Sequence, residues 1–183
     1  MKKKLFILAL ICLCIHVLVI GQNITFQAKA GYKQYKFLNS VYKNTHDQWQ
    51  GIGAAAVIMF REKFFLNMEY SRLKANVIDK TIFYRDHTYL QTLGIGTGYQ
   101  HSFTDRFKIR PAMIVGRSKW ENVKGVNLHV GLGLQYYIFK KLSIFFDTGF
   151  NFLHFDINAP SDITDNYRNA TLLHFQLGLS FRE

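Results

Sequence analysis

The chain lacks cysteine and long apolar runs beyond its first twenty-one residues. Its two cysteines, Cys12 and Cys14, both lie in the apolar run of residues 5–20. A domain without disulfides must hold itself together by burial or by a closed network of hydrogen bonds. No later segment approaches the roughly 20 apolar residues of a membrane helix, so any insertion into a bilayer would have to use strands.

Acidic residues and prolines are also scarce. The chain has 12 acidic residues against 23 basic ones, which gives a net charge of +11, and its two prolines are Pro111 and Pro160. A basic surface suits anionic lipids, polysaccharides or nucleic acid, but no recognisable nucleic-acid motif accompanies the charge, so we expect no nucleic acid as a partner. Pro111 lies inside a segment that otherwise reads as a strand, and there it predicts a weak point or a bulge.

The first residues have the features of a secretory signal peptide. Three lysines precede the apolar run, and Val19 and Gly21 occupy the −3 and −1 positions of a cleavage site. Sixteen apolar residues fall short of the roughly 20 of an anchor helix. We therefore predict a cleaved signal peptide at residues 1–21 and one domain at residues 22–183, in which 20 basic and 12 acidic residues leave a net charge of +8.

Residues 126–139 show the pattern that decides the fold class. Apolar residues occupy every even position from Val126 to Ile138, whereas the odd positions are mostly polar or glycine, as at Asn127 and His129. A period of two indicates a strand with two unlike faces. The segment is longer than the five or six residues usual in globular proteins. It is long enough for a tilted strand across a bilayer, which needs about 9–11 residues.

Eight segments alternate in this way. They lie near residues 24–37, 49–60, 64–75, 87–103, 107–118, 126–139, 142–155 and 168–182. The connections between them alternate between short, at 61–63, 104–106 and 140–141, and longer, near 38–48, 76–86, 119–125 and 156–167. Short turns at one end and long loops at the other are typical of barrels in bacterial outer membranes, where the turns lie in the periplasm.

The faces of these segments separate a membrane barrel from soluble folds. Eleven of the thirteen glycines share the face opposite the apolar residues. A soluble sandwich would place lysine, glutamate and threonine there, because glycine weakens strands. An apolar face turned to lipid permits no open edge, so the sheet must close. We therefore predict an all-β fold: a monomeric, eight-stranded, antiparallel, up-and-down transmembrane β-barrel with a closed, polar, glycine-rich lumen.

With these features the chain resembles the small outer-membrane β-barrel proteins of Gram-negative bacteria, the OmpA/OmpX-like and porin-like barrel families. The resemblance covers the whole mature chain. It rests on the signal peptide, the strand "LQTLGIGTGYQHSF", the turn "FTDRFKIRP" and the last strand "LLHFQLGLSFRE". It implies an outer-membrane location, contact with membrane lipid and lipopolysaccharide, and insertion by the barrel assembly machinery, which reads a terminal aromatic residue, here Phe181. Members serve as adhesins, envelope-stabilising proteins, secretion components or lipid-modifying enzymes.

Charged residues on the inward face form the first candidate site. We predict a structural network of Lys29, Glu69, Lys108, Arg110 and Asp147, in which Lys29 and Arg110 pair with Glu69 and Asp147. Buried charges need partners, and breaking such a pair costs about 3–5 kcal/mol. The alternative is an ion path, which the narrow lumen of an eight-stranded barrel disfavours.

The loops form the second candidate site. Residues that could contact a surface ligand or a partner protein are Tyr42, His46, Trp49, Trp120, Tyr167 and Arg168. Loops on a rigid scaffold are where the functions of a fold vary. Solvated loops without a ligand are the alternative.

Catalytic and metal-binding patterns are weak. The nearest approaches to a nucleophile with a base are His101 with Ser102, Asp86 with His87, and His154 with Asp156. None has the His-x-Ser spacing of deacylases, and the histidines repeat no metal-ligand spacing. We expect no catalytic residue, metal or cofactor. The favoured function is a non-enzymatic envelope protein for envelope integrity, adhesion or surface interaction. A transport or secretion component is an alternative, and a lipid A deacylase- or acyltransferase-like enzyme a weaker one.

Overall fold

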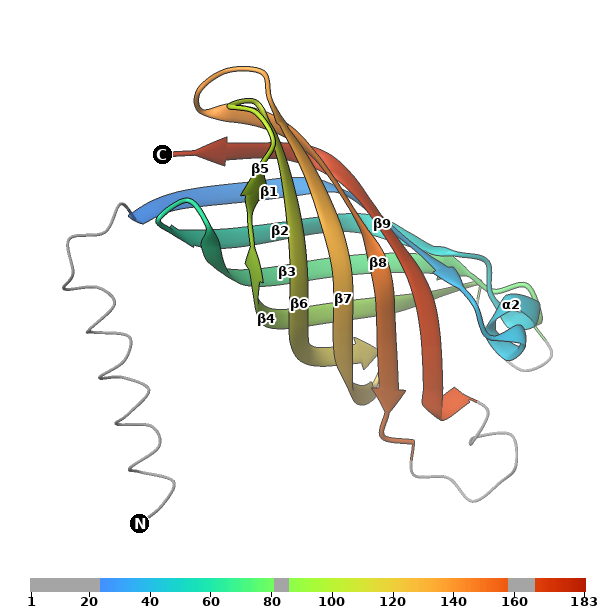
Figure 1. Ribbon diagram of the computed structural model, residues 1–183. Coiled ribbons are helices and arrows are strands. Elements are labelled where there is room, and N and C mark those ends of the chain that lie inside the picture. The colour runs from blue at the N-terminus through green and yellow to red at the C-terminus, as the bar shows by residue number, and fades with distance from the viewer. Residues whose placement is uncertain (1–23, 81–85, 158–166) are drawn as a thin grey trace, which may run out of the picture.

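Strands make up most of residues 24–80, 86–157 and 167–183, the parts of the chain that the computed structural model describes (Figure 1). The elements are β1 (Ile24–Phe37), α2 (Ser40–Thr45), β2 (Trp49–Phe60), β3 (Phe64–Asn76), β4 (His87–Tyr99), β5 (His101–Ser102), β6 (Phe107–Trp120), β7 (Val123–Tyr137), β8 (Leu142–Phe155) and β9 (Asn169–Arg182). All eight segments predicted from the alternation are therefore strands.

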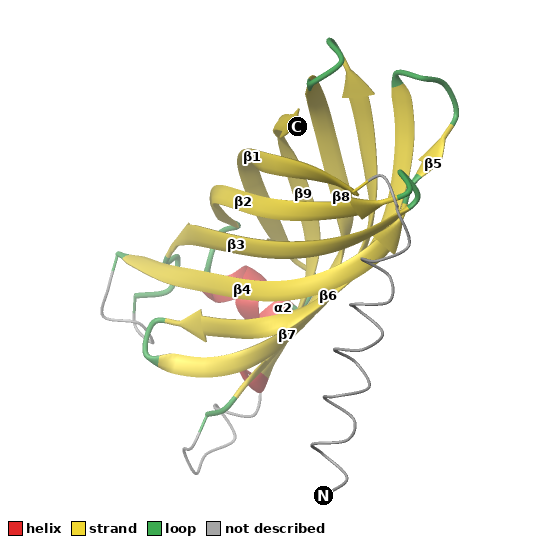
Figure 2. Ribbon diagram, turned by 90° about the vertical axis from the view of Figure 1, so that its left-hand side faces the viewer, coloured by secondary structure: helices red, strands yellow, loops and turns green. Residues whose placement is uncertain are grey.

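The sheet closes on itself as an antiparallel barrel (Figures 1 and 2). Sequence neighbours pair throughout, and the circle is completed where β9 pairs with β1 and β4 pairs with β6. The short β5 continues β4 in the same register against β6, so the barrel has eight strands around its wall. The break at Gln100 lies beside Pro111 of β6, which has no N–H to donate to a neighbour. β6 itself runs unbroken through Pro111, so the weak point or bulge predicted inside that segment is not found.

The tilt of the strands sets the width of the barrel. Paired residues can be followed once around the wall through Gln27, Val57, Asn67, Gly96, Ile114, His129, Asn151, Leu172 and Phe37. The path returns to β1 ten residues from its start, at Phe37 instead of Gln27. Closed barrels of this size have strands tilted by about 35–45° and an interior that side chains just fill.

The two faces of the wall are as predicted. Ile52 and Leu179, on the outer face, are 70% and 55% exposed, whereas the inward Gln135 and Ser143 are almost wholly buried. Exposed aromatic residues ring the end of the barrel where the short turns lie; they include Phe64, Phe103, Tyr136 and Phe181. An apolar band bordered by aromatic residues is the outer surface of a membrane barrel.

One connection differs from the prediction of a loop over residues 119–125. Two residues, Glu121 and Asn122, join β6 to β7 in a tight hairpin, and Glu121 has a φ of 52°. Such two-residue turns suit the twist of paired strands. The hairpin extends beyond the apolar band, and for this reason Lys119 and Lys124 interrupt the apolar alternation. In the sequence, this interruption is indistinguishable from a loop.

Two points concern the membrane directly. Within the described ranges, no helix is long and apolar enough to cross a bilayer. The predicted signal peptide, residues 1–21, lies outside the described residues.

Close approach of strands on the inward face requires glycine at Gly31. This residue faces Gly178 of β9 and Gly53 of β2, and a Cβ added to it would collide with the backbone carbonyl of Leu177. We expect Gly31→Ala to lower the free energy of unfolding by about 1–3 kcal/mol through overpacking, measured by urea unfolding in phospholipid vesicles.

Gly53→Ala is the matched control on the same face. Its added Cβ would lie 3.1 Å from Nε2 of Gln176 and 3.2 Å from Cδ of Lys33, so it requires a shift of only a few tenths of an ångström in side-chain atoms and none in the backbone. Equal loss of stability in the two variants would show that backbone contact does not explain the glycine at position 31.

Candidate functional site

The lumen is filled in layers, which the inward residues of β1 mark from the turn end to the loop end. The fully buried ones are Gln27, Lys29, Lys33, Tyr35 and Phe37, and Gly31 lies between the two lysines. Each contacts side chains of other elements, and for Gln27, Lys29, Lys33 and Tyr35 these include strands that do not pair with β1. From the turn end, the first layer contains an arginine hydrogen-bonded to side-chain amides, and the second contains two ion pairs. The third contains histidine and tyrosine rings with an asparagine, and the fourth is a cluster of aromatic residues at the loop end.

Two ion pairs lie in the middle of the lumen. Nζ of Lys29 is 2.8 Å from Oδ2 of Asp147, and Lys33 pairs with Oε1 of Glu69. The Lys29 ammonium also lies 4.0 Å from the ring centroid of Phe145, a cation–π contact. The sequence predicts that Lys29 and Arg110 pair with Glu69 and Asp147, without assigning the pairs, and it gives no indication of Lys33. Depths were compared by counting from strand ends, which ignores the stagger between tilted strands.

Among the residues that the structure describes, Arg110 pairs with no carboxylate, so that part of the predicted network is wrong. Its Nη1 donates to Oε1 of Gln27 at 2.7 Å and to Oε1 of Gln135 at 2.8 Å. The guanidinium carbon lies 4.4 Å from the ring centroid of Phe65. The stagger of the strands places Arg110 in the layer of Gln27, nearer the turn end than Glu69 and Asp147.

Rings and an amide fill the next layer. His129 and His174 meet edge to face with centroids 4.6 Å apart, and Tyr35 contacts His174 at 5.4 Å. Nδ2 of Asn151 donates to the Tyr35 hydroxyl at 2.6 Å. Side chains of four strands thereby meet across the barrel in this one layer.

Little open space remains among the charges. Lys29, Glu69, Arg110, Asp147 and His174 line a void of about 30 Å³ together with neighbouring residues. Such a void has room for about one or two water molecules. The middle of the lumen is therefore packed.

Aromatic side chains close the loop end. The buried cluster consists of Tyr35, Phe37, Tyr42, Trp49, Leu73, Ala75, Leu90, Trp120, Leu153, Phe155, Tyr167, Ala170 and Leu172, and we call it the plug. The short helix α2, at the loop end in Figures 1 and 2, supplies Tyr42. The Tyr42 ring stacks on Phe37 at 5.1 Å, and its hydroxyl donates to the carbonyl of Tyr167 at 2.6 Å.

Most of the residues predicted to contact a surface ligand are instead buried in or against the plug. Tyr42 and Trp49 are 0% exposed, and His46, Trp120 and Tyr167 are at most 7% exposed. These five therefore do not form an exposed binding surface; Arg168 is half-buried. A usable signal was present for the tryptophans. Each lies an even number of residues from an inward-facing neighbour, Gly51 for Trp49 and Ser118 for Trp120, so strand alternation already turned both rings into the lumen.

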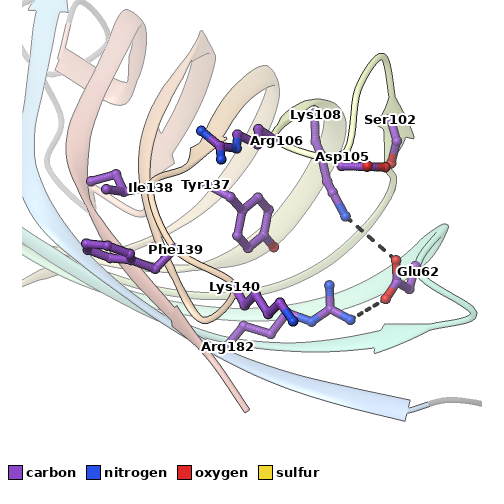
Figure 3. Close-up of a pocket in the computed structure, with 10 residues that line it drawn as sticks. All are labelled: Glu62, Ser102, Asp105, Arg106, Lys108, Tyr137, Ile138, Phe139, Lys140 and Arg182. Carbon is purple, nitrogen blue, oxygen red and sulfur yellow. Dashed lines mark hydrogen bonds and ion pairs between the residues drawn. The ribbon is translucent and has the colours of Figure 1, made fainter.

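A basic vestibule opens at the turn end (Figure 3). Its volume is about 630 Å³, and its lining includes Arg106, Lys108, Lys140 and Arg182. Figure 3 shows Glu62 opposite two of these cations: it lies 3.7 Å from Nζ of Lys108 and also pairs with Arg182. The hydrogen bond from Arg182 lowers the pKa of Glu62, so Glu62 stays ionised. Lys108, predicted to belong to the lumenal network, thus pairs at the rim.

The residue pairs considered for catalysis are separated or differently engaged. His101 and Ser102 are exposed at the turn end, where His101 packs against Phe103 with centroids 4.8 Å apart. Nδ1 of His154 lies 2.7 Å from Oδ1 of Asn169. In the described part of the chain, no group of three His, Cys, Asp or Glu residues is placed to hold a metal ion.

The barrel is similar to solved outer-membrane proteins. OprG from Pseudomonas aeruginosa matches with a TM-score of 0.58 and 10% identity, over 88% of this chain and 97% of OprG. A major outer membrane protein from Thermus thermophilus gives 0.58 and 12%, over 88% and 100%. Ail, the attachment invasion locus protein of Yersinia pestis, gives 0.56 and 12%, over 87% and 98%. No protein-family model matches the sequence, and no curated protein matches it significantly. The likeness shows the fold of small outer-membrane β-barrels.

The Lys33–Glu69 pair gives a direct test of the packed lumen. Lys33→Met leaves the Glu69 carboxylate buried without its partner, and we expect the free energy of unfolding to fall by about 3–5 kcal/mol. Urea unfolding in phospholipid vesicles measures the loss. The control Lys36→Met changes an exposed lysine of the same strand and should cost no more than about 0.5 kcal/mol. Similar losses in both variants would contradict a buried, paired lumen.

The plug should loosen on acidification because the buried ring of His46, neutral at ordinary pH, packs against Trp120 of the plug with centroids 5.7 Å apart. Burial lowers the pKa of His46 to about 4, below the ordinary value near 6.5. The unfolded plug therefore binds the proton more readily, so the stabilisation is complete above about pH 6.5 and is lost as the pH falls towards 4. Both tryptophans of the chain lie in the plug, and we expect their emission to shift to the red over that range.

The variant His46→Phe keeps a ring but cannot take up a proton, so its emission should change much less with pH. His101→Phe, which changes an exposed histidine at the turn end, should respond as the native chain does. A tryptophan shift of native size in His46→Phe would place the titrating group elsewhere.

Proposed function

We propose that this chain is a non-conducting, non-enzymatic protein of the outer membrane that contributes to the integrity of the cell envelope. The observation that carries the proposal is the double closure of the lumen. Ion pairs and amides fill its middle, and the aromatic plug fills its loop end. A solute would have to break buried pairs and displace the plug, and both steps are costly.

Several observations support an outer-membrane location. The outer wall is apolar, aromatic residues ring the turn end, and the fold is that of small outer-membrane barrels. The predicted signal peptide at residues 1–21 supports export, and Phe181 near the C-terminus supports recognition by the barrel assembly machinery. The chain then inserts with its short turns in the periplasm and its longer loops outside.

Surface adhesion is the second candidate. It is supported by the likeness to Ail, which is named for attachment and invasion and has also been solved with the heparin analogue sucrose octasulfate. Because the plug buries the aromatic residues expected to make such contacts, adhesion here would depend on other exposed groups at the loop end. No particular observation favours a transport assembly or a lipid-modifying enzyme.

Planar-bilayer recording tests the closed lumen. We expect the folded native chain to show no steady conductance above background. The double variant Tyr42→Ala/Trp120→Ala removes two central rings of the plug, and, because the ion-pair layer remains, we expect at most brief, small openings. Steady conductance of the native chain would overturn the proposal.

A further inference from the structure

Polar residues on the outer wall near the loop end form a continuous row across four strands. Arg72 of β3, Gln91 of β4, Lys119 of β6 and Lys124 of β7 are successive pairing partners. All four occupy outward positions on their strands, and the three cations are exposed. Adjacent strands are about 4.8 Å apart, so the row presents three cations within a short arc of the wall.

Arg117 extends this row towards the apolar band. Its pairing partners on the two sides are Leu93 of β4 and Val126 of β7, both more than half exposed. A basic side chain thus lies between apolar neighbours, one step below the row. We call Arg72, Arg117, Lys119 and Lys124 the outer basic cluster.

Two shallow grooves meet at Arg117 and Val126, which line both. One, of about 560 Å³, has Tyr70 and Leu93 on its apolar side and Lys119 and Lys124 on its polar side. The other, of about 700 Å³, runs over Leu128 and Phe152 towards His154 and Asn169. Each groove therefore has an apolar part on the membrane band and a polar part towards the loops.

Basic residues predominate in this region, although Glu121 of the β6–β7 hairpin accepts a hydrogen bond from the Tyr89 N–H beside it. On the strands as described, no Asp or Glu faces outward, and none of the four cations of the outer basic cluster forms an ion pair within the described ranges. Asp156 is the one acidic residue that lines the first groove. Arg72 lies 5.6 Å from the ring centroid of Tyr89. At the turn end, in contrast, Glu62 pairs with Lys108 and Arg182.

We propose that these grooves bind a phosphorylated lipid of the outer leaflet, such as the lipid A part of lipopolysaccharide. The inference rests on the proposed function, which places the barrel in the outer membrane. The phosphate would lie against Arg117, Lys119 and Lys124, and the acyl chains against Leu93, Val126 and Phe152. Arginine binds phosphate oxygens in pairs, and lysine adds a point charge.

A lipid explains the arrangement better than a soluble anion does. Cations at the edge of an apolar band favour a ligand whose charge lies at the same depth, because long basic side chains reach the headgroup layer from there. A soluble anion would make no favourable contact with the apolar part of each groove. The shared polar and apolar character therefore matches a ligand that joins a phosphate to hydrocarbon chains.

Native mass spectrometry of the folded barrel in detergent micelles can count bound lipid. The probes are bisphosphorylated lipid A, monophosphorylated lipid A and phosphatidylcholine. We expect the bisphosphorylated form to bind most tightly and phosphatidylcholine not to be retained. The variant Arg117→Gln/Lys119→Gln should weaken binding about tenfold or more through loss of charged hydrogen bonds. The control Lys140→Gln/Lys141→Gln removes two exposed charges at the turn end and should leave binding unchanged.

Two results would overturn the inference. One is equal lipid A binding by the two double variants. The other is binding of inorganic phosphate or sucrose octasulfate that Arg117→Gln/Lys119→Gln abolishes while lipid A binding is absent, which would mark a site for soluble anions. Heat-modifiable gel migration and bilayer recording on the same preparations separate the proposals. A folded, non-conducting barrel that does not bind lipid A would refute the lipid site alone. A chain that does not insert into membranes would refute both the lipid site and the proposed function.

Discussion

A backbone that crosses hydrocarbon must pair all of its N–H and C=O groups internally, and the rest of this structure depends on that constraint. The pairing of β9 with β1 satisfies it by removing both edges of the sheet. Closure with eight strands and a stagger of ten residues then fixes a narrow interior. A narrow interior must be packed, and this explains why glycines meet across neighbouring strands on the inward face, as Gly31 and Gly178 do.

The packing changes character along the barrel axis. At the level of the apolar band, the charged side chains lie inside the lumen, and Lys29 and Lys33 each have a carboxylate partner there. Beyond the band, near the loops, the outside becomes basic and the inside becomes aromatic. Large rings can lie inside at this level because α2 and the chain at Tyr167 cover them. The plug thus gives the loop end a hydrophobic core of its own, separate from the lipid-facing surface.

Much of the fold could be predicted from alternation, because lipid outside and a filled lumen inside demand opposite residue types at successive positions. The contacts within the lumen and at the loop end were harder to predict from the sequence. Lys29 and Asp147 belong to the predicted network, which does not assign its pairs, whereas Arg110 binds the amides of Gln27 and Gln135 and not a carboxylate as expected. Counting residues from the strand ends gives the depth of a side chain along the barrel axis only if the strands run parallel to that axis. Trp49 and Trp120 were placed on the surface because they lie beside loops, although their register turned them inward.

The sequence by itself determined which face of each strand meets lipid, the number of strands and the closure of the sheet. All three follow from eight segments with a period of two and from a sequence that, after residue 21, has no apolar run of membrane-helix length. Only the tertiary structure decided which inward residues meet. The stagger between strands brings Lys33 to Glu69 and gives Arg110 the amides of Gln27 and Gln135 as partners. It also aligns Arg72, Lys119 and Lys124 in one outward row. The contacts of Lys33 and Arg110 depend on register between segments far apart in the chain, and local alternation restricts that register only to shifts of an even number of residues.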